Sequence, residues 1–237
     1  MPTTTIKARG ILFDLDGTLI SSTPVCEAVW HKWVKEYPYV DLREVFKSSH
    51  GIRTRELLRY WLKITDPVAL EAATEKFESD VLKEAERIAS SGGDGIRLLP
   101  GVQKLLVGLN DVSKDTSRWA IVTSATNAYA TTAITTVDLP KTSHLITADE
   151  VTRGKPHPEP YIMGAAALGL HPTECIVFED APSGVKAGVA SGALVVAVCT
   201  SHNRKALEGL GAHHIVEDLS LICLDTEGDE VTIAFPC

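Results

Sequence analysis

The sequence contains neither a long apolar segment nor an excess of basic residues. No stretch approaches the roughly 20 apolar residues that span a bilayer, and the first ten residues, MPTTTIKARG, lack the apolar region of a signal peptide. Lys and Arg number 23 against 31 Asp and Glu, for a net charge of −8, which excludes the basic surface typical of nucleic-acid-binding proteins. We therefore expect a cytoplasmic protein with no membrane or nucleic-acid partner, and a monomer by default.

Cysteine is scarce and scattered. The 5 cysteines include no C-x-x-C pair and are widely spaced, which indicates neither a disulfide framework nor a zinc site. A reducing compartment follows, in agreement with the cytoplasm. The cysteines are Cys26, Cys175, Cys199, Cys223 and Cys237.

An apolar run near the N-terminus ends abruptly in two carboxylates. In ILFDLDGTLI, residues 11–20, the first three residues predict a strand buried on both faces, and Gly17 ends it. Asp14 and Asp16 cannot remain unpaired in an apolar interior, so we expect them at the carboxyl end of the strand, where open parallel sheets bind ligands. Two acids at this spacing suit a hard cation, and a carboxylate without other partners can attack phosphorus. The alternative is an ordinary Asp-Gly turn.

Two kinds of pattern divide the chain. Between the first strand and the glycine-rich SSGGDG, residues 90–95, the patterns predict only helices, at about 24–37, 41–47, 53–63 and 67–90. Beyond this linker, short apolar strands alternate with helices, which is typical of a parallel sheet in an α/β domain. We predict a Rossmann-like α/β core formed by residues 1–21 and 96–237. Residues 22–95 are an inserted α-helical cap domain, placed to cover the site.

The pattern also predicts the positions of the later elements. Helices are expected near 100–110, 127–138, 158–169, 182–191 and 203–210, and strands near 118–123, 144–147, 175–179, 194–199 and 213–216. A terminal pair, residues 221–224 and 231–235, surrounds TEGD and predicts a hairpin at the sheet edge. In the cap, the charges from Glu71 to Arg87 are expected to form a solvated helix face.

Three further polar groups follow strands or lie in a restrained loop. Ser124 follows a predicted strand, where its hydroxyl and the next backbone N–H groups can hold phosphoryl oxygens, although such a serine is more often a helix N-cap. Lys155 lies in GKPHPEPY, whose Gly and Pro fix a cation, although most loop lysines are merely solvated. Glu179 and Asp180 end the strand CIVFED, and capping of the next helix would explain one of them. Four carboxylates so close together would repel, and a divalent cation resolves that repulsion.

These strings together resemble a known family. DLDGT, IVTS, GKPHPEPY and FEDAPSG occur in the order of the four motifs of the haloacid dehalogenase superfamily of hydrolases. The helical insertion between the first two motifs is similar to the subfamily with an α-helical cap. With SHGIRT in the cap, the chain resembles the fungal phosphatases that act on glycerol phosphate and on 2-deoxyglucose 6-phosphate. Ala125 departs from the pattern, since many relatives have Gly after the Ser.

The resemblance implies a role for each motif. Asp14 would be the nucleophile that forms an aspartyl-phosphate, and Asp16 the acid and base that protonates the leaving alkoxide and then activates water. Ser124, Ala125 and Lys155 would hold the substrate phosphate. The expected cofactor is Mg²⁺, because it keeps waters and binds through few carboxylates plus substrate phosphate. Its ligands would be Asp14, the backbone carbonyl of Asp16, Asp180, and Glu179 through water.

The cap would select the substrate, a small phosphorylated sugar or polyol. His50 and Arg53, in the cap string SHGIRT, are candidates for substrate binding, with a structural role as the alternative for each. Arg153 and His157, beside Lys155, are expected to be structural.

Two other functions share parts of this pattern. Sugar phosphomutases of the same superfamily form the same intermediate, but those that this region resembles carry a His about twelve residues beyond the nucleophile, where Cys26 is a weak hydrogen-bonding substitute. A phosphoacceptor signalling domain also combines an acidic cluster with a Ser or Thr and a Lys. Such a domain leaves its phosphoryl group exposed at the surface, whereas this chain has a helical lid. We therefore predict a Mg²⁺-dependent phosphoric monoester hydrolase.

Overall fold

A parallel sheet of six strands forms the centre of the molecule. The computed structural model describes residues 4–112, 118–142, 144–227 and 230–235. The strand order is β6-β5-β2-β7-β8-β9, so the first strand in the sequence lies in the middle, which confirms the predicted Rossmann-like α/β class. The strands are β2 Gly10–Phe13, β5 Trp119–Val122, β6 Leu145–Ile146, β7 Cys175–Glu179, β8 Leu194–Val198 and β9 His214–Val216.

The central strand β2 is buried on both faces, as its continuous apolar run predicts. Ile11, Leu12 and Phe13 are fully buried and pair in parallel with β5 on one side and β7 on the other. The Phe13 ring stacks on that of Phe178 with centroids 5.1 Å apart, directly beneath the carboxyl end of both strands. This packing gives the residues that follow β2 and β7 a rigid base.

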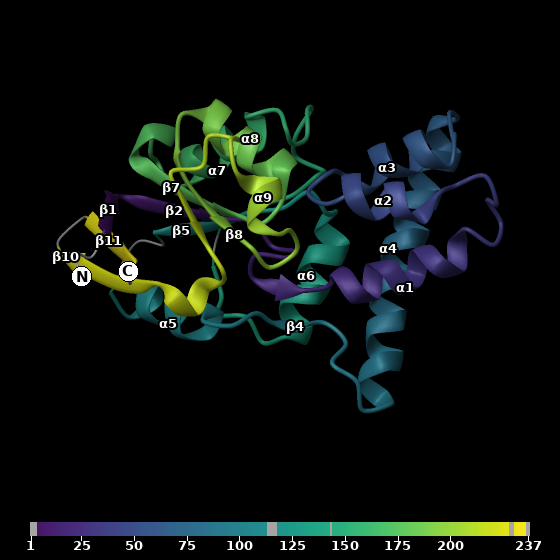
Figure 1. The fold of residues 1–237 in the computed structure, drawn as a ribbon, viewed down its shortest axis with the longest axis horizontal. Helices are drawn as coiled ribbons and strands as arrows, with labels where there is room; N and C mark the ends of the chain where they lie inside the picture. Colours follow the sequence, from purple (N-terminus) through teal and green to yellow (C-terminus); the bar gives the residue numbers. More distant parts are fainter. Residues whose placement is uncertain (1–3, 113–117, 143, 228–229, 236–237) are drawn as a thin grey trace.

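Helices cover both faces of the sheet. The side chain of Leu12 packs in the core beneath α7, Glu159–Ala167, and α8, Pro182–Ser191. Ile11 and Phe13 point the other way, into the core beneath α5, Val102–Val112, and α6, Asn127–Thr136. In Figure 1, α7 and α8 lie above the sheet and α5 below it. The molecule thus has the three-layer arrangement of a doubly wound fold.

A separate group of four helices stands beside the sheet, on the right in Figure 1. These helices are α1 Thr23–Trp33, α2 Leu42–Ser48, α3 Thr54–Trp61 and α4 Pro67–Ser90. Asp66 caps α4 by accepting from the Ala69 N–H, and Pro67 occupies its first turn. The rings of Trp30 and Trp33 on α1 each lie 5.1 Å from that of Phe77 on α4, which holds the two helices together.

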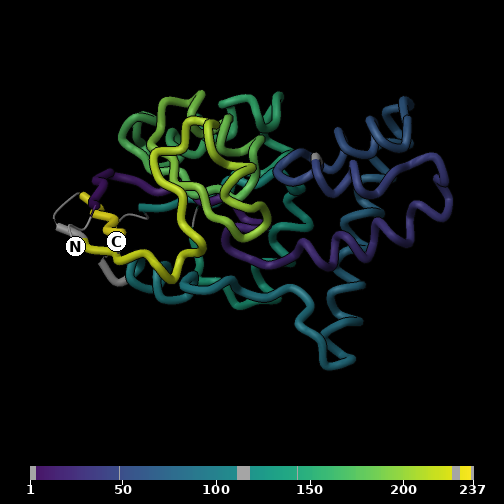
Figure 2. Tube along the Cα trace, viewed as in Figure 1, coloured from purple at the N-terminus to yellow at the C-terminus, as the bar shows by residue number. Residues whose placement is uncertain are grey.

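The chain leaves the sheet and returns to it at one place. Strand β3, Ile20–Ser21, leads into α1 and pairs antiparallel with β4, Arg97–Leu98, which follows α4. The tube in Figure 2 shows these two connections side by side, so the four helices are joined to the sheet by a single pair of strands.

The terminal hairpin corrects one expectation. Strands β10, Cys223–Glu227, and β11, Glu230–Phe235, pair antiparallel as predicted, but they do not extend the main sheet. They form a separate three-stranded sheet with β1, Thr4–Ala8, a strand that the polar sequence TTTIKA did not predict. The hairpin therefore needs a partner from the opposite end of the sequence, which local patterns do not reveal.

Two smaller expectations are also corrected. Helix α9, Arg204–Leu207, is a single turn rather than the predicted 203–210, because the backbone becomes extended at Glu208. On α4, most of the charged residues are solvated, but Glu78 and Glu84 are buried, at 5% and 4% exposure. Short 3₁₀ turns at Pro172–Glu174 and Leu219–Leu221 complete the described elements. Within the described ranges, no helix combines the length and apolar character that crossing a membrane would require.

Candidate active site

The predicted acidic residues meet at the point where the strand order reverses. Strands β2 and β7 are neighbours at the centre of the sheet, and the chain diverges from this pair in both directions. Asp14 follows β2, and its backbone N–H donates to the Phe178 carbonyl at 3.0 Å, while Asp180 follows β7. The carboxyl ends flanking such a switch point form the crevice in which open α/β sheets bind ligands.

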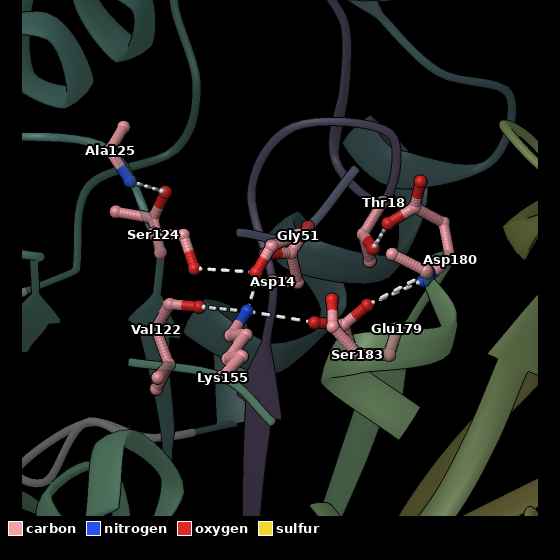
Figure 3. A network of polar contacts seen from close by, with 12 residues as sticks. Asp14, Thr18, Gly51, Val122, Ser124, Ala125, Lys155, Glu179, Asp180 and Ser183 are labelled. Atoms are coloured by element: carbon pink, nitrogen blue, oxygen red, sulfur yellow. Dashed lines mark hydrogen bonds and ion pairs between the residues drawn. The ribbon is translucent and has the colours of Figure 1, made fainter. Parts of the chain in front are cut away.

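Lys155 is the centre of a buried polar network (Figure 3). Its side chain is fully buried, and its Nζ donates to Asp14 Oδ1 at 2.6 Å, to Glu179 Oε1 at 2.7 Å and to the Val122 carbonyl at 2.9 Å. All three ammonium hydrogens are therefore used by groups from β2, β5 and β7. Lys155 fixes the orientation of Asp14 relative to the sheet.

Burial and neighbouring charges set the protonation of this network. Burial raises the pKa of Asp14 to about 7; Lys155 opposes the increase, whereas Glu179 adds to it. Burial alone would lower the pKa of Lys155, but the carboxylates of Asp14 and Glu179 outweigh it and raise the pKa above its usual value. The pKa of Asp180 is raised by burial and then by Asp14. A single buried cation, Lys155, thus lies among three buried carboxyl groups.

The arrangement fits a divalent cation. Asp14, Glu179 and Asp180 present oxygens within 4.8 Å of one another. Among the described residues, Asp14 Oδ2 and Asp180 Oδ2 are buried oxygens with no hydrogen-bond partner, a costly state that a cation would relieve. Hard cations such as Mg²⁺ bind oxygens of this kind.

Glu179 is already saturated by the protein. Its Oε1 accepts from Lys155 and from the Tyr161 hydroxyl at 2.9 Å, and its Oε2 accepts from the backbone N–H groups of Asp180 and Ala181. The expectation that Glu179 reaches a metal only through water is compatible with this geometry and stays a prediction. Its visible role is to hold Lys155 and the start of α8.

Gly17 is required at the edge of this cluster. Its φ is +92°, a conformation that L side chains rarely adopt, and a Cβ there would collide with Asp180 Oδ2 and with the Ser201 hydroxyl. The glycine of DLDGT therefore lets the loop after β2 approach the carboxylate that follows β7.

Asp16 is held in place by two hydroxyl groups. Its Oδ1 accepts from Ser22 Oγ at 2.6 Å and from the Tyr129 hydroxyl at 2.8 Å. Burial raises the pKa of Asp16, and these two hydrogen bonds reduce the increase. The pKa of Tyr129 is itself raised well above its usual value by burial, so its hydroxyl remains a donor. A carboxyl group with a raised pKa at this edge is suited to proton transfer.

The loop between α2 and α3 lies across the carboxyl ends of the strands. Ser124 Oγ donates to the Gly51 carbonyl at 2.9 Å, and Ser183 Oγ donates to the His50 carbonyl at 3.0 Å. The His50 ring also meets that of His202, with Nδ1 and Nε2 3.4 Å apart. The backbone N–H of Ala125 donates to Thr123 Oγ1 at 3.1 Å. The structure therefore brings Ser124 and His50 to the predicted site, with the Ser124 hydroxyl held by the loop.

Arg53 does not reach the acidic cluster. Its guanidinium donates to the carbonyls of Val151 and Thr152 at 3.1 and 3.3 Å and pairs with Glu56. These contacts tie the start of α3 to the loop before Lys155, and they favour the structural alternative for Arg53 over substrate binding. Of the two other expected structural residues, Arg153 pairs with Glu159 at 3.7 Å and His157 accepts from the Glu159 N–H at 3.2 Å.

A cavity of about 130 Å³ lies between the acidic residues and the four helices. Its floor belongs to the sheet side of the molecule, and its wall belongs to α1, α2, α3, α4 and the loop after α2. The floor includes Asp14, Asp16, Thr123, Ser124, Ala125 and Tyr129. The wall includes Cys26, Glu27, Trp30, Phe46, His50 and Glu78.

The sequence patterns missed three residues of this site. Ser22 and Tyr129 orient Asp16, and Glu78 enters the cavity from α4. None belongs to a recognisable string. Tyr129 lies 113 residues from Asp16 in the sequence, and Glu78 lies on an ordinary charged helix. Of the three residues, only Ser22 could have been suspected from the sequence, because it lies six residues after Asp16, at the start of the predicted cap.

The sequence matches a known family and is similar to several named phosphatases. Residues 11–198 match the model of the family described as haloacid dehalogenase-like hydrolase. The chain is 38% identical to hexitol phosphatase A of Escherichia coli (strain K12) over 196 residues, covering 81% of this chain and 84% of the relative. It is 34% identical over 249 residues to glycerol-1-phosphate phosphohydrolase 1 of Saccharomyces cerevisiae, covering 99% and 95%. It is 37% identical over 226 residues to 2-deoxyglucose-6-phosphate phosphatase 1 of the same yeast, covering 89% and 88%.

Proposed function

The chain belongs to the haloacid dehalogenase-like hydrolase family, and from that premise we propose that it is a phosphatase for phosphate monoesters of small sugars or polyols. The observation that carries the proposal is the position of Asp14. Its Oδ1 is fixed by a buried lysine, while its Oδ2 is free of hydrogen bonds among the described residues at the switch point of the sheet. A carboxylate held in this way is oriented for attack on phosphorus.

The first step transfers the phosphoryl group to Asp14. A carboxylate oxygen of Asp14 forms a bond to phosphorus while the bond from phosphorus to the ester oxygen breaks. Asp16 gives its proton to the departing oxygen, which leaves as an alcohol. The raised pKa of Asp16 favours the protonated form that this step requires.

The second step releases inorganic phosphate. Asp16, now ionised, takes a proton from a water molecule whose oxygen attacks the phosphorus of the aspartyl-phosphate. The bond from phosphorus to Asp14 breaks, and both carboxyl groups return to their starting states. Ser22 and Tyr129 keep Asp16 in place for both proton transfers.

Mg²⁺ is the proposed cofactor. Asp14 and Asp180 would hold it directly, together with the backbone carbonyl of Asp16, and Glu179 would do so through water. When bound, the ion neutralises the negative charge that develops on the phosphoryl oxygens. The two unpartnered carboxylate oxygens support this ligand set.

Residues 22–95 are the proposed cap, and the core comprises residues 1–21 and 96–237. The loop over Ser124 and the cavity beneath α1 and α4 support a role in excluding water and selecting the leaving group. In the phosphoryl subsite, Ser124 and the backbone at Ala125 would bind phosphate oxygens once the hydroxyl leaves the Gly51 carbonyl. Lys155 would act by holding Asp14. A phosphomutase and a signalling domain are less supported, because all three relatives are named as phosphatases or phosphohydrolases.

The test is phosphate release from the substrates of those relatives. With Mg²⁺, a hexitol phosphate, glycerol 1-phosphate and 2-deoxyglucose 6-phosphate should each yield the free alcohol and inorganic phosphate, and phosphorus NMR follows the reaction. Excess EDTA should abolish release, and added Mg²⁺ should restore it. Full activity in EDTA would contradict the metal assignment. Faster accumulation of a positional isomer from a hexose phosphate, with a sugar bisphosphate present, would identify a mutase instead.

A second prediction concerns the orientation of Asp16. Tyr129→Phe should lower kcat about 10- to 100-fold, because Asp16 loses one of the two hydroxyl donors that position it for proton transfer. KM should change little, since no bond to the phosphoryl group is removed. Tyr39→Phe removes a hydroxyl that donates to the Leu62 carbonyl within the cap and should leave kcat unchanged. A kcat for Tyr129→Phe equal to that of the control would show that Ser22 alone suffices.

A further inference from the structure

The charges around the cavity are divided between its floor and its cap wall. At the phosphoryl end, Lys155 lies beneath Asp14 and Glu179 and does not reach the cap wall. On the cap wall, Glu27 on α1 and Glu78 on α4 line the cavity. Among the described residues, none of those lining the cavity is a Lys or an Arg. The cap wall therefore contributes two acids and no basic side chain to this cavity.

Glu78 is fixed in this position by neutral donors. Its Oε1 accepts from the Thr54 hydroxyl at 2.8 Å and from the Thr126 N–H at 3.4 Å, and its Oε2 accepts from the Thr126 hydroxyl. Burial raises the pKa of Glu78, and the hydrogen bonds from Thr126 and Thr54 reduce the increase. A carboxylate has about four lone-pair sites, so these three hydrogen bonds leave acceptor capacity. No ion pair to Glu78 occurs within the described ranges, although Glu84, on the same helix, pairs with both Lys32 and Arg87.

The remaining wall is apolar or neutral. Trp30, Phe46 and Phe77 supply aromatic surface, which suits the C–H faces of a carbon chain. His50 is the remaining titratable base of the wall, and its pKa is lowered to about 4 by burial and by His202, so it adds no positive charge near neutral pH. A hydroxyl of the leaving group can donate to Glu78 or Glu27, whereas an anionic group would face both acids without compensation.

We propose that Glu27 and Glu78 make the cap wall of the cavity a site for uncharged, hydroxyl-bearing leaving groups and exclude esters whose leaving group carries a carboxylate or a second phosphate. This inference rests on the proposed phosphatase activity. It adds a selection by charge that is separate from the chemistry at Asp14. It also disfavours a mutase cycle, because such a cycle must accept a sugar bisphosphate.

The test uses pairs of substrates that differ in one group. Glycerol 3-phosphate and 3-phosphoglycerate have the same length and differ by CH₂OH against carboxylate, as do glucitol 6-phosphate and 6-phosphogluconate. We expect kcat/KM to be at least about 100-fold lower for the carboxylate member of each pair, since like charges would meet in a site without a counter-cation. A ratio within tenfold would overturn the inference while leaving the phosphatase intact, whereas no release from any of the four esters would count against the proposed function itself.

Two variants assign the selection to these residues. Glu78→Gln and Glu27→Gln should each reduce the ratio between paired substrates by about tenfold, because each removes one of the two negative charges. A merely structural role would lower kcat/KM for both members and leave their ratio unchanged. Glu75→Gln, an exposed position on the same helix α4, is the matched control and should leave the ratio at the wild-type value. If Glu78→Gln does not fold, the test rests on Glu27→Gln, at a half-buried position on α1. An unchanged ratio between the paired substrates for Glu27→Gln would contradict the proposal.

Discussion

Replacing Asp14, the proposed nucleophile, should abolish turnover without unfolding the protein. Asp14→Asn keeps the size of the side chain and an oxygen for Lys155, but it removes the anionic oxygen that is proposed to attack phosphorus. We expect kcat to fall by about 10⁴-fold or more, equivalent to at least about 5.4 kcal/mol of barrier. The measurement is phosphate release with saturating substrate and Mg²⁺, with circular dichroism to establish that the fold is retained.

The control and a second readout separate chemistry from folding. Asp94→Asn makes the same chemical change at an exposed site before β4 and should leave kcat unchanged. Acid-quenched wild-type protein should carry one phosphoryl group by intact mass during turnover, and the Asp14→Asn variant should carry none. Turnover within about tenfold of wild type would remove Asp14 from the nucleophile role.

Removing Lys155 should produce the largest loss of stability. Lys155→Met has similar length but leaves Asp14 and Glu179 buried without their cation, together with the unpaired Val122 carbonyl. Removing one partner of a buried ion pair costs about 3–5 kcal/mol, so the free energy of unfolding should fall by that amount in Mg²⁺-free buffer. Denaturant titration measures this change, and kcat should fall as well because Asp14 loses its orientation.

An exposed ion pair provides the comparison. Lys7→Met removes the partner of Glu230, at 3.2 Å on the surface, and should change the free energy of unfolding by at most about 1 kcal/mol. Equal losses for the two substitutions would mean that Lys155 contributes no more than a surface charge, and would contradict the central position assigned to it.

Elements with local signals were predictable from the sequence. Helix α8 begins at Pro182, as predicted, because proline suits the first turn, and it ends before Gly192, whose φ of +89° favours glycine. The acids and Lys155 were predictable because each follows an apolar strand or lies in a restrained loop, and the ends of neighbouring parallel strands must meet.

Contacts between distant segments were not predictable. Strand β1 is polar and mostly exposed, so no periodic pattern marks it, and its pairing depends on β11. Glu78 looks like one more charge on a charged helix, and only the packing of α4 against α6 reveals that it is buried beside Thr126. Arg53 could bind phosphate or carbonyls equally well by its chemistry, and the position of the loop before Lys155 decides between them.

The central position of β2 has a consequence for how the chain folds. Ile11 pairs with Trp119 on one side and with Ile176 on the other. Both strands beside β2 are therefore synthesised long after it. Pairings between residues so far apart in sequence form late, because closing the long loop costs entropy before the new contacts stabilise the pairing. During synthesis, Asp14 therefore leaves the ribosome long before Lys155, Glu179 and Asp180. A chain stopped before residue 155 would carry the proposed nucleophile without Lys155, which holds its side chain.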